Sequence, residues 1–266
     1  MNNKTKKVAV VIPCYKTILS SDEKISLKHL NKFLGRYDKF FISPNSVGKL
    51  SFDAAKIKTI YFADEYFTSV QKYSKLLTTK SFYEKFLGYE YILIYQFDAL
   101  VFSDQLLSWC NKGYDYIGAP LYNSVIGNLS QKKGSPASGG NGGFSLRKVE
   151  SFIKTIDLAE SVARRTLANR KIGQFWFLLA ALTNRSHGIW LNCPPQNYPF
   201  NEDGFWSFEA VKYYPKFKVA PFREALEFSF EKSPEKCFRL NNKKLPFGCH
   251  AWARYNRIFW DKYLIS

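Results

Sequence analysis

Short apolar runs recur along the first half of the chain, separated by segments whose apolar residues repeat with a helical period. The runs over residues 8–13, 40–44 and 57–62 predict strands, and the first, continuously apolar and closed by proline, is typical of a strand buried on both faces. Residues 64–79 predict an amphipathic helix, and residues 89–100 (YEYILIYQFDAL) predict the most hydrophobic strand. This alternation predicts an α/β fold with a mostly parallel sheet between layers of helices.

The second half of the chain continues with shorter elements around one long polar interruption. Residues 123–141 are rich in Gly, Ser, Asn and Lys without periodicity, which predicts a mobile functional loop. Prolines exclude a helix over residues 188–200. The other expected elements are helices over 103–112, from Lys148, over 157–183 and over about 202–214, and strands over 114–120, 142–147 and 217–222.

No internal repeat or linker divides the sequence, so we expect one continuous domain over residues 1–266. We expect residues about 1–120 to form a nucleotide-binding-like half and residues about 121–266 to form a half that shapes the site of a second, acceptor substrate. The segment from Pro246 onward is dense in aromatic residues. It is too apolar to be a free tail, and we expect it to pack on the body of the domain.

The composition fits a folded, reduced protein. Apolar residues make up 46% and aromatic residues 18% of the chain, which excludes an intrinsically disordered protein. The five cysteines are widely spaced without a Cys-x-x-Cys pair, so we expect reduced, buried thiols rather than disulfides or a zinc ribbon. The apolar runs are too short for a signal peptide core or a membrane span. These features predict a cytoplasmic protein.

The charge balance leaves several partners open. Lys and Arg number 39 against 22 Asp and Glu, a formal net charge of +17. Such an excess suits nucleic acid, an anionic membrane surface or an anionic substrate. The basic residues are dispersed and accompany no nucleic-acid motif, so we expect no nucleic-acid partner. Peripheral contact with the inner face of the membrane fits the charge as well as solubility does.

Asp98 lies at the end of the most hydrophobic strand, where open α/β sheets bind ligands. Gln96 falls on the same side of the strand, because side chains alternate with a period of two. Asp98 could bind Mg²⁺ or Mn²⁺ and, through it, a diphosphate, or it could cap a turn.

Two further places carry candidate chemistry. Glu202 and Asp203 open a predicted helix after the proline-rich segment, so either could be a general base, or both could complement the helix dipole. His250 lies in a Gly-Cys-His-Ala-Trp segment and could be a metal ligand with Asp98 or a buried core histidine.

Glycines surround Asn141 in the segment GGNGGFSLR, which is neither a dinucleotide fingerprint nor a Walker loop. Glycines before a strand allow the backbone to approach a ligand closely, although a glycine-rich hairpin is the alternative. Arg147 at the end of this segment could meet a phosphate or a carboxylate.

Together these motifs resemble GT-A-fold glycosyltransferases, and more closely a family of bacterial and viral glycosyltransferases long catalogued as a domain of unknown function. The resemblance rests on YQFDALVF, WCNKGYDYIGAP, GNGGFSLR, NEDGFW and PFGCHAW, in that order, and runs from about Val8 to about Tyr255. It implies a GT-A-like, Rossmann-type mixed sheet flanked by helices in a single domain. One departure is Gln96, an uncharged residue at the first position of the family's Asp-x-Asp.

The resemblance also implies a role for each matching residue. Asp98 and His250 would bind the metal, Mn²⁺ or Mg²⁺, and Asp203 or its neighbour Glu202 would be the base of an inverting enzyme. The donor, a nucleoside-diphosphate sugar such as a UDP sugar, would contact the residues Pro13, Cys14, Tyr15, Gln96, Asp98, Gly142 and Gly143.

The function that follows is a hexosyl- or N-acetylhexosaminyltransferase acting on a glycan or glycolipid acceptor, in surface polysaccharide or lipopolysaccharide synthesis. A nucleotidyltransferase of similar fold remains open, and it would release pyrophosphate instead of a nucleoside diphosphate. So does a non-catalytic nucleotide-sugar-binding protein, which would bind the donor without turnover.

Overall fold

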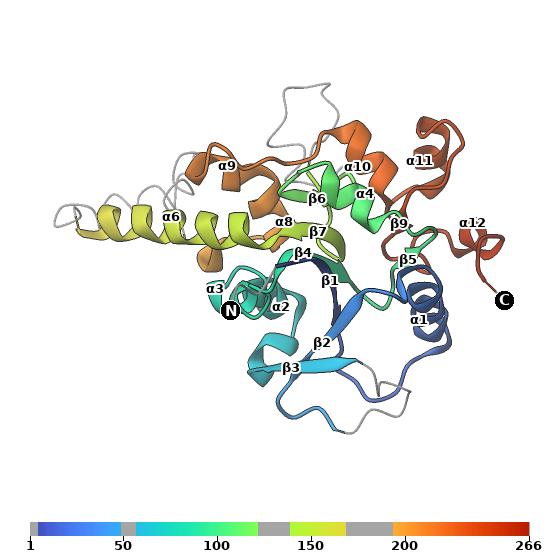
Figure 1. Cartoon of the computed structure of the whole chain (residues 1–266), viewed down its shortest axis with the longest axis horizontal. Helices are drawn as coiled ribbons and strands as arrows, with labels where there is room; N and C mark the ends of the chain where they lie inside the picture. The colour runs from blue at the N-terminus through green and yellow to red at the C-terminus, as the bar shows by residue number, and fades with distance from the viewer. Residues whose placement is uncertain (1–4, 49–56, 122–138, 169–193, 266) are drawn as a thin grey trace.

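A six-stranded sheet of order β3-β2-β1-β4-β7-β6 lies at the centre of the computed structural model, which describes residues 5–48, 57–121, 139–168 and 194–265 (Figure 1). From β3 to β4 neighbouring strands are parallel, whereas β7 is antiparallel to both β4 and β6. This confirms the predicted mixed α/β fold. The strands are β1 (Lys6–Pro13), β2 (Asp38–Pro44), β3 (Lys58–Phe62), β4 (Tyr89–Tyr95), β6 (Tyr116–Gly118) and β7 (Phe144–Lys148).

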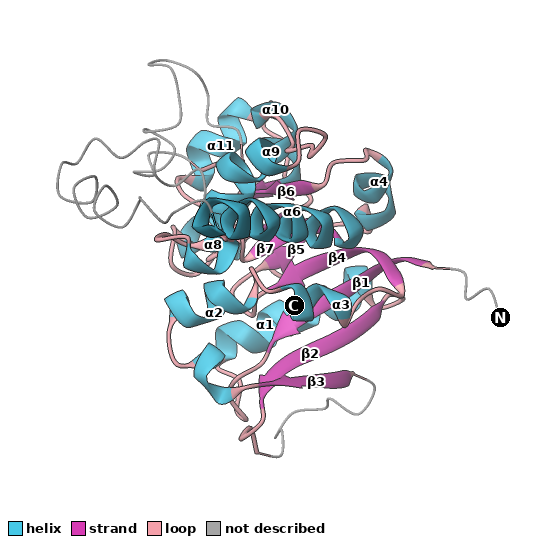
Figure 2. Ribbon diagram, turned by 90° about the vertical axis from the view of Figure 1, so that its left-hand side faces the viewer, coloured by secondary structure: helices cyan, strands magenta, loops and turns pink. Residues whose placement is uncertain are grey.

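Strand β1 is buried on both faces, as its continuous apolar run predicts. Val10 and Ile12 belong to the hydrophobic core that also contains Leu30 of α1 (Ser21–Leu34) and Trp109 of α4 (Leu106–Asn111). Val11 points to the opposite core. There it packs with residues of α2 (Val70–Leu76), α3 (Lys80–Glu84) and α6 (Val149–Ala168). Two layers of helices therefore cover the sheet, because successive side chains of a strand face opposite sides, with α1 on one side and α2 and α3 on the other (Figure 1). Seen from the side of α6, that helix lies in front of β7 (Figure 2).

Two of the predicted elements are divided in the structure. The helix expected over 64–79 is a 3₁₀ turn, η1 (Asp64–Phe67), followed by α2, because the Ser69 hydroxyl accepts from the Lys72 amide and starts a new helix. The strand expected over 89–100 ends at Tyr95, where the Ala99 amide donates to the Gln96 carbonyl in a turn at 2.9 Å. Beyond that turn, β5 (Leu100–Val101) belongs to a different sheet.

In the described part of the chain, a second sheet of three strands has the order β5-β9-β8, with β8 (Ser229–Phe230) and β9 (Gly248–Cys249). Its core includes Trp252 and Trp260, which are fully buried, so the predicted packing of the segment after Pro246 is confirmed. The helices around it are α10 (Phe222–Phe228), α11 (Pro234–Leu240) and α12 (Arg257–Asp261).

The elements over residues 195–222, which precede β8 in the chain, differ in part from expectation. The strand predicted over 217–222 is wrong: Val219 forms an isolated bridge with Tyr116, and α10 begins at Phe222. The helix predicted over about 202–214 is present as three consecutive turns, and a short 3₁₀ helix precedes it. These are η4 (Pro195–Asn197), α8 (Glu202–Gly204), the π-helical η5 (Phe205–Glu209) and α9 (Ala210–Tyr213).

Some predictions fall on residues that the structure does not describe. Most of the loop expected over 123–141, the end of the helix expected over 157–183 and Cys193 lie outside the described residues. Within them, Cys14, Cys110, Cys237 and Cys249 are free and buried. None of the described helices combines the length and the apolar character needed to cross a membrane.

Candidate active site

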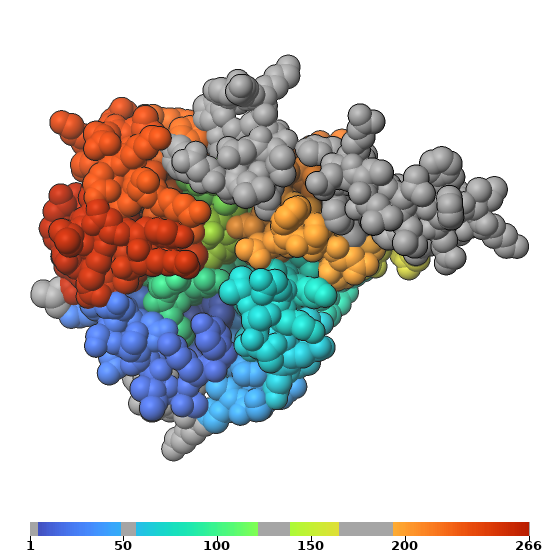
Figure 3. Space-filling view, turned by 180° about the vertical axis from the view of Figure 1, so that it is seen from behind, coloured from blue at the N-terminus to red at the C-terminus, as the bar shows by residue number. Residues whose placement is uncertain are grey.

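The carboxyl ends of β1 and β4 lie side by side at one edge of the sheet, because the strands are parallel and Val11 pairs with Ile94. Ligands bind at this edge in open α/β sheets. Figure 3 views the molecule from this side and shows a hollow where the blue and cyan N-terminal segments meet the orange and red C-terminal ones. Most of the predicted site residues lie around this edge.

Asp98, Gln96 and His250 form a cluster at the end of β4. The Nε2 atom of His250 lies 3.2 Å from Asp98 Oδ1 and 3.1 Å from Gln96 Oε1. The Asp98 side chain is 51% exposed and that of His250 is 11% exposed. The structure thus brings together Asp98 and His250, the two residues predicted to bind a metal. Gln96 adds its side-chain oxygen as a third donor atom beside them.

Backbone hydrogen bonds fix both halves of this cluster. The Gln96 amide donates to the Gly143 carbonyl at 3.0 Å, at the point where β4 leaves the sheet. On the other side, the His250 amide donates to the Phe230 carbonyl at 2.9 Å, and the Trp252 amide donates to the Asp98 carbonyl at 3.2 Å. The second sheet therefore carries His250 to the end of the first.

Opposite charges set the protonation of the cluster. Burial raises the pKa of the Asp98 carboxyl, but the hydrogen bond and charge of His250 outweigh burial and lower it. Burial lowers the pKa of His250, whereas the carboxylates of Asp98 and Glu231 outweigh burial and raise it to about 10. Without a bound cation, His250 is therefore positively charged at neutral pH.

The donor atoms of this cluster fit a divalent cation. Ligands at about 2.1 Å on neighbouring octahedral positions lie about 3 Å apart, close to the distances from His250 Nε2 to the Asp98 and Gln96 oxygens. Among the described residues, no three His, Cys, Asp or Glu side chains are grouped to hold a metal. An ion here would complete its ligands with water and substrate oxygens, as Mg²⁺ commonly does.

The glycine segment packs directly against this cluster. A Cβ atom on Gly143 would lie 2.1 Å from His250 Nε2, and one on Gly142 would lie 2.3 Å from Glu202 Oε1. These two positions therefore require glycine because side chains of the site occupy the space. Protein side chains fill the place of a Cβ atom at both positions. That the glycines also allow close approach of a ligand stays a prediction.

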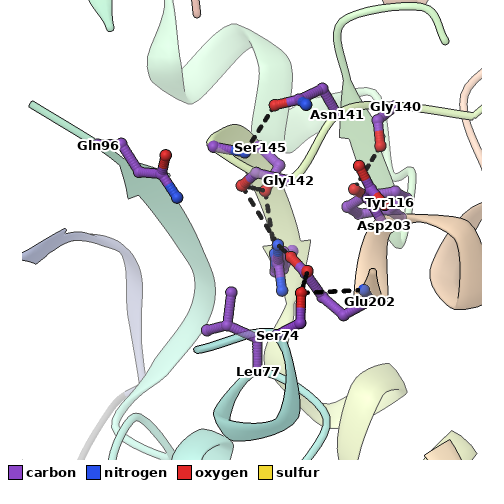
Figure 4. A network of polar contacts seen from close by, with 12 residues as sticks. Ser74, Leu77, Gln96, Tyr116, Gly140, Asn141, Gly142, Ser145, Glu202 and Asp203 are labelled. Atoms are coloured by element: carbon purple, nitrogen blue, oxygen red, sulfur yellow. Dashed lines mark hydrogen bonds and ion pairs between the residues drawn. The ribbon is translucent and has the colours of Figure 1, made fainter. Parts of the chain in front are cut away.

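Glu202 belongs to a buried polar network (Figure 4). Its Oε1 accepts from Arg147 Nη2 at 2.9 Å and its Oε2 accepts from the Ser74 hydroxyl at 2.7 Å. The Arg147 side chain is 0% exposed and that of Glu202 is 7% exposed. Arg147 also donates to the Tyr83 hydroxyl at 3.0 Å and to Ser145 Oγ at 3.0 Å. The sequence left a phosphate or a carboxylate open as the partner of Arg147, and in the structure the partner is the carboxylate of Glu202.

Asp203, the next residue, has different surroundings. It is partly exposed, and its Oδ1 accepts from the Gly204 amide at 2.8 Å. Burial and the neighbouring Glu202 raise the pKa of its carboxyl to about 7. A carboxyl that titrates near neutral pH is suited to general base catalysis.

The residues after β1 are also at the sheet edge. Pro13 and Cys14 are buried, and Tyr15 is 60% exposed. The Cys14 amide donates to the Ile42 carbonyl at 2.9 Å, and burial raises the pKa of its thiol to about 11. Of the three, Tyr15 alone has an exposed side chain.

Sequence reasoning missed two side chains of the site. Ser74 supports Glu202, and Glu231 lies 3.4 Å from His250 Nδ1 through its Oε1. Neither belongs to a motif: Ser74 is distant in sequence from Glu202, and Glu231 reaches His250 through the pairing of β8 with β9. Only the tertiary structure reveals them.

The fold is that of the GT-A glycosyltransferases. The galactosyltransferase LgtC, solved with donor and acceptor sugar analogues, matches with a TM-score of 0.51 at 10% identity over 91% of this chain and 86% of LgtC. GlyE of Streptococcus pneumoniae gives a TM-score of 0.46 at 12% identity, over 98% of this chain and 61% of GlyE. A glycosyltransferase involved in glycosylating the major capsid of PBCV-1 gives 0.43 at 11% identity, over 97% and 98% of the two chains.

The chain belongs to the protein family of unknown function DUF5672, whose sequence pattern matches residues 56–250. The matched region contains Asp98, the glycine segment, Glu202, Asp203 and His250. No curated protein sequence matches significantly.

Proposed function

We propose that this protein is a glycosyltransferase that moves a sugar from a nucleoside-diphosphate donor to a glycan or glycolipid acceptor. The observation that carries the proposal is the convergence of His250 Nε2, Asp98 Oδ1 and Gln96 Oε1 at the carboxyl end of β4. The LgtC-like fold supports it, because glycosyl transfer is the activity named for that neighbour.

The donor would lie across the ends of β1 and β4. Tyr15 is exposed beyond β1 and would stack on the base, with Pro13 and Cys14 beneath it. Asp98, His250 and Gln96 would hold a divalent cation, Mn²⁺ or Mg²⁺, which when bound stabilises a departing diphosphate. Arg254 adds positive charge, since its guanidinium contributes to lowering the pKa of Asp98.

Asp203 would remove the proton from the attacking acceptor hydroxyl. Its partly exposed carboxyl has its pKa raised to about 7, which suits a base at neutral pH. Glu202 would act through its neighbour, because both of its oxygens are engaged by Arg147 and Ser74. Direct attack with Asp203 as base inverts the anomeric configuration of the transferred sugar.

The finer assignment is part of the same proposal and rests on the resemblance to GT-A-fold glycosyltransferases. The donor is a UDP sugar carrying a hexose or an N-acetylhexosamine, and the product belongs to a surface polysaccharide or lipopolysaccharide. Residues about 1–120 bind the donor, and about 121–266 bind the acceptor. The charge of +17 favours a cytoplasmic protein in peripheral contact with an anionic membrane.

A thermal-shift panel of nucleoside diphosphates and nucleotide sugars, with and without Mn²⁺, tests the proposal. A ligand at about a hundred times its dissociation constant adds about 2.7 kcal/mol of stability. We expect uridine diphosphate with Mn²⁺ to raise the Tm of the wild type and not that of Asp98→Ala. Asp261→Ala, which changes an exposed aspartate on α12, is the matched control.

The reaction product separates the alternatives. Glycosyl transfer releases the nucleoside diphosphate, whereas nucleotidyl transfer releases pyrophosphate, and the anomeric configuration of the product reports inversion. Binding without any turnover on a panel of acceptors would contradict the enzymatic proposal and favour a nucleotide-sugar-binding protein.

A further inference from the structure

The second ring nitrogen of His250 faces a carboxylate. Nε2 lies at Asp98 and Gln96, while Nδ1 lies 3.4 Å from Oε1 of Glu231. Nδ1 is buried, and among the described residues no atom forms a hydrogen bond with it in this geometry. The Glu231 side chain is 10% exposed. The imidazole is thus held between the site on one side and Glu231 on the other.

Asn141 holds the Glu231 carboxylate in place. Its Nδ2 donates to Glu231 Oε1 at 3.1 Å, the oxygen that faces His250, and its Oδ1 accepts from the Gly143 amide at 2.8 Å. The Asn141 amide itself donates to the Ala119 carbonyl at 2.8 Å. Both ends of the side chain are therefore engaged, which fixes the orientation of its amide group.

The same turn limits the position of the imidazole. Gly143 packs against the ring so closely that a Cβ atom there would lie 2.1 Å from Nε2. Its amide is bound to Asn141, and Asn141 is bound to Glu231, which faces Nδ1. One connected set of contacts therefore runs from the glycine segment through Glu231 to the far side of the His250 ring.

We propose that Glu231 is a positioning residue, held by Asn141, that orients the His250 ring with Nδ1–H toward the carboxylate. Nε2 then faces Asp98 and Gln96, and its lone pair becomes available there when a cation takes the place of the Nε2 proton. A carboxylate accepts hydrogen bonds only, so it favours the ring orientation and tautomer with Nδ1–H on its side. Partners of this kind behind a metal-binding histidine commonly change metal affinity by about 10–100-fold when they are mutated. The cation that Nε2 would bind rests on the proposed function, whereas the orientation of the ring does not depend on it.

The first test measures cation affinity. Mn²⁺ is titrated into the whole chain with saturating uridine diphosphate, and free Mn²⁺ is followed by electron paramagnetic resonance. We expect Glu231→Gln to weaken Mn²⁺ binding about 10–100-fold and to leave metal-free binding of uridine diphosphate unchanged. Glu227→Gln is the matched control, because Glu227 has a side chain 43% exposed and pairs with Arg223 on α10.

The second test reads the ring directly and needs no activity. The chain has three histidines, so the imidazole ¹⁵N–¹H signals of His250 are assigned by comparison with His250→Asn. We expect the wild type and Glu227→Gln to show a slowly exchanging Nδ1–H signal, which Glu231→Gln loses. Asn141→Ala, which frees the carboxylate without changing its charge, should shift the same signal by less, and it is a second probe if Glu231→Gln unfolds.

The outcomes distinguish this inference from the proposed function. An Nδ1–H signal in Glu231→Gln and Asn141→Ala identical to that of the wild type would overturn the role of Glu231. If the wild type binds neither Mn²⁺ nor uridine diphosphate, the proposed function fails, and the imidazole spectra still decide whether Glu231 positions the ring.

Discussion

Adjacent carboxylates at positions 202 and 203 show how strongly surroundings decide the role of a residue. Glu202 is buried against Arg147 and Ser74, and both of its oxygens are used. Asp203 is partly exposed, and the pKa of its carboxyl is raised to about 7 by burial and by Glu202. The pair thus divides into a structural carboxylate and a group that exchanges protons near neutral pH.

The pKa of Asp203 predicts how activity depends on pH. If the ionised carboxylate is the base, kcat/KM rises about tenfold per pH unit below pH 7 and levels off above it. A pH–rate profile between pH 5 and 9, at saturating Mn²⁺, measures this. A flat profile between pH 6 and 8 would contradict the assignment.

The contribution of Asp203 to the free energy of unfolding should fall with rising pH, whereas the activity should rise. Folding raises the pKa of Asp203 from its usual 3.8, so the protonated form is favoured in the folded state. Its stabilising contribution is complete below about pH 4 and is lost as the pH rises through about 7. Asp203→Asn, compared with the wild type by denaturant unfolding across this range, should remove that part of the pH dependence.

Glu202 should matter more for stability than for proton transfer. Glu202→Gln leaves the fully buried Arg147 without its counter-charge, and breaking a buried pair costs about 3–5 kcal/mol in the free energy of unfolding. Urea unfolding measures the loss. Asp157→Asn breaks an exposed pair with Lys80 and should cost at most about 1 kcal/mol. Equal effects in the two variants would mean that the buried network is not a structural pair.

At the scale of elements, the segment between β6 and β7 joins the two halves of the site. Gly142 packs on Glu202 and Gly143 packs on His250, while Asn141 reaches Glu231. Strand β7 then runs antiparallel beside β4 and carries Arg147 into the core. A short glycine turn thereby places the proposed cation-binding residues and the proposed base around one edge of the sheet.

Gly143→Ala tests this arrangement. The new methyl group would lie 2.1 Å from His250 Nε2, so the imidazole must move out of its position. We expect binding of Mn²⁺ with uridine diphosphate to weaken at least about tenfold, as for a lost metal-orienting contact. Gly88→Ala is the control, because a Cβ atom there meets nothing within 4 Å. Titration calorimetry measures both, and wild-type affinity in Gly143→Ala would contradict the packing argument.

At the scale of the whole molecule, the C-terminal part completes the site from the far side. The small sheet β5-β9-β8 begins directly after the Asp98 turn and ends directly before His250, so the two residues meet although they are distant in sequence. Behind it, Trp260 stacks on Phe102 with ring centroids 5.4 Å apart, and Trp260 is fully buried. The aromatic C-terminal segment therefore supports the element that carries His250.

Trp260→Ala should destabilise the protein substantially. Removing a fully buried tryptophan commonly costs about 3–5 kcal/mol, because a cavity remains against Phe102 and Phe259. Thermal and urea unfolding measure the change. Ile258→Ala lies on the same helix with its side chain 83% exposed, and it should change stability by less than about 0.5 kcal/mol. A cost for Trp260→Ala as small as that of Ile258→Ala would show that this segment packs loosely.

The sequence by itself determined the α/β class, the strand at 8–13 and the residues Asp98, Asp203 and His250 as candidates. An apolar run that ends at proline or glycine is a local signal. It can be recognised in the sequence because a strand buried on both faces requires consecutive apolar residues. The division of the 64–79 helix at Ser69 and the absence of a strand over 217–222 depended on single caps and bridges, which periodicity does not register.

Only the tertiary structure decided which of the candidates meet and how each is used. Glu202 and Asp203 are equivalent in sequence, and they differ because Arg147 and Ser74 reach one of them. Glu231 belongs to no motif, yet the pairing of β8 with β9 places it beside His250, and Asn141 holds its carboxylate there. Protonation, hydrogen bonding and close packing depend on atoms that lie within a few ångströms in space, and the chain brings those atoms together from distant segments only when it folds.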